Sequence, residues 1–97
     1  MINEKEILQC AIGTYGRQAQ LDMAIEECAE LINAIQKHRR GRVGDKDVID
    51  EIADVRIMTE QLAIIFGEEE VEARRQFKLA RLQSRMSGTE KSYKNLD

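Results

Sequence analysis

The sequence predicts an all-α protein, an antiparallel four-helix bundle that we expect oligomerisation to complete. Two observations favour this class: proline is absent with aromatic residues at 4% of the chain, and apolar residues recur with a helical period. Residues 1–87 are expected to form a single helical domain. Residues 88–97 are polar and without period, which is typical of a flexible tail. A chain of 97 residues supports only a modest core, so a second copy would help to cover it.

Start and stop signals delimit each expected helix. Asn3 followed by Glu6 is typical of an N-cap with its capping box. Glycines are expected to end the later helices, because glycine favours the conformation that closes a helix. Acidic residues at 68–70 suit the first turn of a helix, where the dipole stabilises negative charge. The expected helices start near residues 4, 18–21, 45–47 and 68–70, and end near residues 16, 37–40, 66 and 86.

Two glutamates fall where a helical core is expected to have apolar side chains. On a helical wheel, Glu27 lies inside the apolar arc of the second helix and Glu51 inside that of the third. Each has a second acid one turn further on, Glu30 and Asp54, at the margin of the same arc. A buried carboxylate without a partner is costly, so these groups are expected to have a cationic partner.

The two acid pairs predict a site for a hard divalent cation. The connection between the second and third helices is short, so these helices are expected to be antiparallel neighbours that bring the pairs face to face. Mg²⁺ prefers oxygen ligands, whereas zinc and di-iron are disfavoured because His38 is the only histidine. Four carboxylates are too much charge for one Mg²⁺, so a second ion or an ion–substrate assembly is expected. The alternative for Glu27 and Glu51 is a structural ion pair with Arg56 or Arg75.

Charge and hydropathy exclude several classes of partner. A net charge of −3 argues against a surface for nucleic acid polymers. No apolar stretch approaches the length of a membrane span, and no signal peptide opens the chain, so no membrane partner is expected. Cys10 and Cys28 lie in helical patterns and are expected to be reduced, buried thiols, which suits a cytoplasmic protein.

Basic residues suggest where phosphate would bind. Arg74, Lys78, Arg81 and Arg85 form one stripe on the fourth helix. This stripe either forms structural salt bridges or contacts a phosphate chain, with Lys78 and Arg81 as the best candidates. The connection over residues 37–46 is also basic, and is either a lid over phosphates or a solvated loop.

Amide and apolar side chains leave further alternatives open. Gln20 and Asn33 are possible readers of a base edge, or ordinary surface residues. The third helix carries a second apolar strip, which is either a subunit interface or covered by another helix of the same chain. This strip consists of Ile49, Ala53, Ile57 and Ile64.

The five acids Glu26, Glu27, Glu30, Glu51 and Asp54 resemble the EExxE…ExxD signature of the MazG-like all-α nucleoside triphosphate pyrophosphohydrolases. The resemblance covers about residues 18–62. It implies Mg²⁺-dependent hydrolysis of a (deoxy)nucleoside triphosphate to the monophosphate and pyrophosphate, with Mn²⁺ as a substitute, by a homodimer or homotetramer. It further implies that the last four acids bind metal and that Glu26 orients or deprotonates a water.

A second function belongs to a different class. In this alternative the chain is a catalytically silent helical oligomerisation or interaction module, and its inward acids form structural ion pairs with the basic stripe. Mg²⁺ separates the two hypotheses. An enzyme is expected to gain thermal stability with Mg²⁺ and a non-hydrolysable triphosphate, whereas a module is not.

Overall fold

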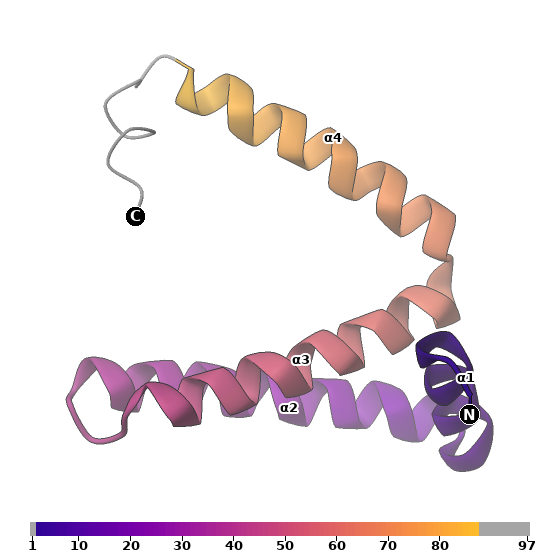
Figure 1. Cartoon of the computed structure of the whole chain (residues 1–97), viewed down its shortest axis with the longest axis horizontal. Helices are drawn as coiled ribbons and strands as arrows, with labels where there is room; N and C mark the ends of the chain where they lie inside the picture. Colours follow the sequence, from indigo (N-terminus) through magenta and orange to yellow (C-terminus); the bar gives the residue numbers. More distant parts are fainter. Residues whose placement is uncertain (1, 88–97) are drawn as a thin grey trace. The chain divides into compact units, whose positions relative to one another are not determined.

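The computed structural model describes residues 2–87, and this part of the chain contains four α-helices and no strand (Figure 1). The all-α class is therefore confirmed. The chain divides into two compact units, one that ends at Phe66 and one that begins at Gly67. The single domain over 1–87 and the four-helix bundle stay predictions, and the predicted tail at 88–97 lies outside the described residues. The helices are α1 (Glu4–Tyr15), α2 (Arg17–Arg39), α3 (Asp45–Phe66) and α4 (Glu68–Met86).

Local sequence signals account for the ends of these helices. The Asn3 side-chain oxygen accepts a hydrogen bond of 2.8 Å from the backbone N–H of Glu6, which confirms the expected N-cap. Gly16 separates α1 from α2 with a φ of +91°, and Gly41 lies in the connection after α2 with a φ of +72°. Residues with a Cβ rarely adopt such angles, so glycine is required where the chain changes direction.

The helices α2 and α3 form an antiparallel hairpin (Figure 1). Near the start of α2, the Arg17 guanidinium lies over the Phe66 ring at 5.2 Å from its centre. At the other end of α2, His38 Nε2 lies 2.6 Å from Asp45 Oδ1 at the start of α3. Residues further along α2 thus meet residues earlier in α3, as the short connection predicts. The first helix, α1, packs against both.

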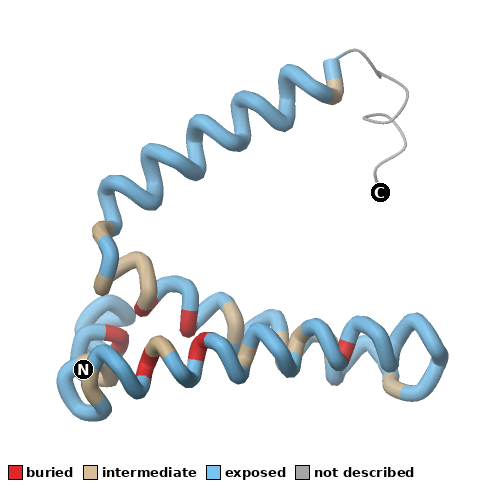
Figure 2. The backbone as a smooth tube through the Cα atoms, turned by 180° about the vertical axis from the view of Figure 1, so that it is seen from behind, coloured by how far each residue is buried: buried red, intermediate tan, exposed pale blue. Residues whose placement is uncertain are grey.

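The core of the first unit is small and lies between these three helices (Figure 2). Ala24 and Ala34 are buried on α2, and their small side chains allow a close approach of α3. The buried residues of the described chain are Leu8, Gln20, Ala24, Ala34, Met58 and Gln61.

Many large apolar side chains remain exposed in the single chain. Ile25 on α2 is 69% exposed, and Ile49 and Ile57 on the second apolar strip of α3 are 61% and 49% exposed. Cys10 and Cys28 carry free thiols, as expected, but both are exposed, so the prediction that they are buried is wrong. Among residues 2–87, no helix is long and apolar enough to cross a membrane.

The described part of the second unit contains one helix, α4. The Arg74 guanidinium lies over the Phe77 ring at 4.6 Å from its centre, and Arg75 lies 3.6 Å from the Glu72 carboxylate one turn earlier. Lys78 and Arg81 are exposed. Arg74 and Arg75 therefore contact neighbouring residues of α4 itself.

Candidate metal centre

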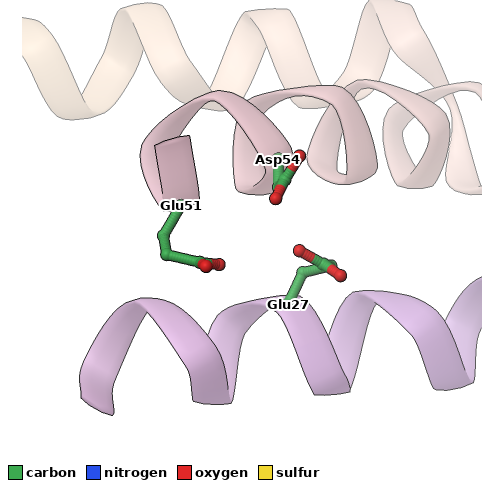
Figure 3. A group of neighbouring side chains, drawn as sticks. All are labelled: Glu27, Glu51 and Asp54. Carbon is green, nitrogen blue, oxygen red and sulfur yellow. The ribbon is translucent and has the colours of Figure 1, made fainter. Parts of the chain in front are cut away.

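Three acidic side chains from two helices point toward a common volume (Figure 3). Glu27 comes from α2, and Glu51 and Asp54 come from one face of α3. One carboxylate oxygen from each residue lies within 4.8 Å of the other two. We call this group the acid triad. It brings together three of the four predicted metal ligands.

The apolar arcs of α2 and α3 place these acids where the two helices pack against each other, a surface that we call the seam of the hairpin. Glu27 is half-buried beside the buried Ala24, and Glu51 is half-buried one turn after Val48. Met23 is 41% exposed, so the apolar arc on α2 is narrower than the helical wheel suggests. The expected inward position of both glutamates is nevertheless confirmed, because one oxygen of each is shielded from solvent.

These shielded oxygens have no partner within the described chain. Glu27 Oε2 and Glu51 Oε2 are buried and accept no hydrogen bond from any residue over 2–87. Arg75, one of the two arginines considered as a partner, belongs to the second unit, where it lies 3.6 Å from Glu72. Buried polar atoms in folded proteins are almost always satisfied, so these two oxygens are candidate acceptors for a cation or another donor.

Electrostatics at the triad also favour a cation. Burial raises the pKa of Glu27, and repulsion by Glu30, Asp54 and Glu51 raises it further. Burial likewise raises the pKa of Glu51, with additional repulsion from Glu30, Asp54 and Asp50. Ionising both groups therefore costs more free energy in the fold than in solvent. A divalent cation would remove the repulsion and stabilise the ionised forms.

The other predicted site residues lie in different surroundings. Glu30 is exposed and lies outside the triad, yet its charge raises the pKa of two triad members. Glu26 is exposed and also lies outside the triad. Gln20 is 6% exposed, and its Nε2 donates a 2.7 Å hydrogen bond to Gln61 Oε1, so this amide is engaged between α2 and α3.

One feature of the seam was missed by sequence reasoning. Gln61 lies seven residues after Asp54, the same spacing as between Gln20 and Glu27. This spacing predicts a second polar layer two turns from the acids. Lys37, expected at the start of the basic connection, lies in α2 seven residues after Glu30 and lines a cavity of about 170 Å³ with it.

The donor set fits Mg²⁺. Three carboxylates supply the hard oxygen ligands that this ion prefers, and the two orphaned oxygens belong to residues of that set. Mg²⁺ commonly retains waters and recruits substrate phosphates, which suits a site with one exposed member, Asp54.

No protein-family model, curated protein or solved structure matches this chain. The likeness to the MazG-like enzymes thus rests on the acids of the motif and their spacing.

Proposed function

We propose that the protein is a Mg²⁺-dependent hydrolase that converts a (deoxy)nucleoside triphosphate to the monophosphate and pyrophosphate. The observation that carries this proposal is the acid triad, in which Glu27 and Glu51 each have a buried oxygen without a partner. An acid-rich seam of this kind favours a divalent cation and would repel an anion that arrives without one. A polyphosphate is the substrate class that such a cation attracts.

Glu27, Glu51 and Asp54 would hold the ion, and Glu30 would add a ligand at the edge of the site. Mg²⁺ held by these residues would supply charge neutralisation for the phosphates and Lewis-acid polarisation. Mn²⁺ would substitute because it accepts the same oxygen ligands.

The protein's own residues supply the remaining steps. Glu26 would accept a proton from the attacking water while the water oxygen bonds to phosphorus. The bond between the α phosphate and the bridging oxygen, or between that oxygen and the β phosphate, breaks, and monophosphate and pyrophosphate leave. Lys78 and Arg81 stay predicted phosphate contacts, and their substitution is expected to raise KM. Gln20 would support α2 and α3, because its amide is bonded to Gln61.

A homodimer or homotetramer is part of this proposal. Exposed isoleucines such as Ile25 and Ile49 leave apolar surface that a second copy would cover. The same association would complete the four-helix bundle. The free thiols of Cys10 and Cys28 suit the reducing cytoplasm in which we place the protein.

The alternative of a silent interaction module requires cations at the inward acids. Within residues 2–66, neither Glu27 Oε2 nor Glu51 Oε2 has such a partner. The module would therefore need cations from the basic stripe of α4 or from a second copy, whereas the hydrolase would need Mg²⁺ at the same oxygens.

Pyrophosphate release from a panel of standard and damaged NTPs and dNTPs tests the proposal. With Mg²⁺, at least one nucleotide should yield pyrophosphate, and Mg²⁺ with a non-hydrolysable triphosphate should raise the melting temperature. Glu60→Gln is the matched control, because Glu60 is an exposed acid of α3 outside the triad. No pyrophosphate and no Mg²⁺ effect on stability would favour the interaction module.

A further inference from the structure

A small cavity on the α2–α3 hairpin adjoins the acid triad. It has a volume of about 170 Å³ and includes Glu51 of the triad together with Glu30. Its wall is completed by the buried Ala34, by Val43 from the connection, and by polar residues of both helices. A group bound in this cavity would therefore lie next to an ion held by the triad.

The cavity contains two hydrogen-bond donors without partners. Lys37 and Asn33 line it from α2, and within residues 2–87 the structure gives neither side chain an ion pair or a hydrogen bond. Asn33 and Lys37 follow Glu30 by three and seven residues, so all three share one face of the helix. An ammonium that leaves the nearby acids unpaired is available to an anion.

The size of the cavity restricts what that anion is. Pockets for drug-sized ligands usually measure about 300–1,000 Å³, well above the 170 Å³ found here. A nucleoside would not lie wholly inside this volume, whereas a phosphate group would. An ammonium and an amide can both donate hydrogen bonds to phosphate oxygens, and the ammonium adds a charge-assisted contact.

The charge of the lining sets a condition on binding. Three carboxylates, Glu30, Asp47 and Glu51, surround the single ammonium of Lys37. A free phosphate would be repelled by these acids. A phosphate that brings Mg²⁺ with it would be repelled less, because the ion would offset part of the negative charge of Glu51 and its neighbours.

From these observations we infer that Lys37 and Asn33 bind the terminal phosphates of the Mg²⁺-bound triphosphate, the part that leaves as pyrophosphate. This inference rests on the proposed function and adds a basis for its specificity toward triphosphates. The contact would distinguish triphosphates from monophosphates, which lack the β and γ phosphates assigned to the cavity. The nucleoside then lies outside the cavity.

Binding of nucleotides to the full chain tests this assignment. Isothermal titration in Mg²⁺ would compare a triphosphate with a non-hydrolysable α–β bridge against the matching monophosphate. Lys37→Met should weaken triphosphate binding by about tenfold or more, because a charge-assisted contact is lost, and should leave monophosphate binding unchanged. Lys37→Arg should restore much of the affinity. Lys46→Met is the matched control, since Lys46 is an exposed lysine of the same hairpin that does not line the cavity.

The outcomes separate this inference from the function on which it rests. If the wild-type protein binds the triphosphate in Mg²⁺ and Lys37→Met binds it equally well, the assignment of Lys37 fails while the hydrolase stands. Equal weakening of both nucleotides would also overturn it. If the wild type binds neither Mg²⁺ nor triphosphate, both proposals fail. Melting temperatures of the variants, measured without nucleotide, show whether each one folds.

Discussion

Two polar layers cross the seam between α2 and α3, and they differ in how their atoms are satisfied. In the glutamine layer, Gln20 donates to Gln61 over 2.7 Å, and both residues are buried. In the acid triad, Glu27 and Glu51 each keep a buried oxygen without a partner. One layer is satisfied within the described chain, and the other leaves two buried oxygens open to a ligand.

We interpret this difference as a structural against a proposed functional role. The glutamine layer is neutral, and its hydrogen bond joins α2 to α3, which favours one register of the two helices. The triad collects like charges, and the pKa values of Glu27 and Glu51 are raised, so their ionised forms are less favourable in the fold than in solvent. Clusters of like charge with raised pKa values are common at functional sites, where a bound ligand offsets the repulsion.

The largest effect is expected from removing one charge of the triad. Glu51→Gln should lower kcat/KM by about 10²- to 10³-fold, because a metal ligand that supports the transition state is lost. The metal-free variant should be as stable as the wild type or more so, since a like charge has gone. Pyrophosphate release and urea unfolding measure the two quantities. Marked unfolding of the variant would instead indicate a structural ion pair at Glu51.

Breaking the glutamine layer should have the opposite pattern. Gln61→Leu leaves the buried Gln20 amide without its partner and should lower the free energy of unfolding by about 1–3 kcal/mol. Adding Gln20→Leu should recover much of that loss, which a double-mutant cycle by urea unfolding would quantify. A cycle with no coupling between the two sites would mean that the bond contributes nothing to stability.

The two layers should also respond differently to pH. Burial raises the pKa of Glu27 and Glu51 in the folded protein, so the fold binds more protons than the unfolded chain above the ordinary glutamate pKa. The free energy of unfolding of the metal-free protein should fall as pH rises from about 4.3 through the raised pKa values. Saturating Mg²⁺ should reduce this fall, and Glu51→Gln should flatten the curve measured in EDTA. An identical pH profile for wild type and variant would contradict the raised pKa.

The smallest effect is expected at an exposed pair outside both layers. Arg75 and Glu72 lie 3.6 Å apart on α4 with side chains 62% and 55% exposed. Arg75→Ala should change the free energy of unfolding by at most about 0.5 kcal/mol, because solvent screens such pairs. Chemical unfolding with and without 1 M NaCl would check this, and a larger loss would show that Arg75 has a role beyond this pair.

Helical periodicity predicted much of the hairpin. The inward position of Glu27 and Glu51 followed from their apolar neighbours, and the short connection predicted that α2 and α3 run antiparallel. A helical wheel treats each helix separately, so it did not indicate that Gln20 would find a partner 41 residues away. For the same reason it did not indicate that Cys28 would remain exposed, since burial depends on which faces other helices cover.

Ala24 and Ala34 have a consequence for ion selectivity. Both residues are small and buried on α2, so a close approach of α3 depends on their size. Under the proposed function, the distance across the seam would select for ionic radius. Ligand distances are about 2.0–2.1 Å for Mg²⁺ and 2.3–2.6 Å for Ca²⁺. A bulkier residue at position 24, one turn before Glu27, would spread the helices and shift the preference toward the larger ion.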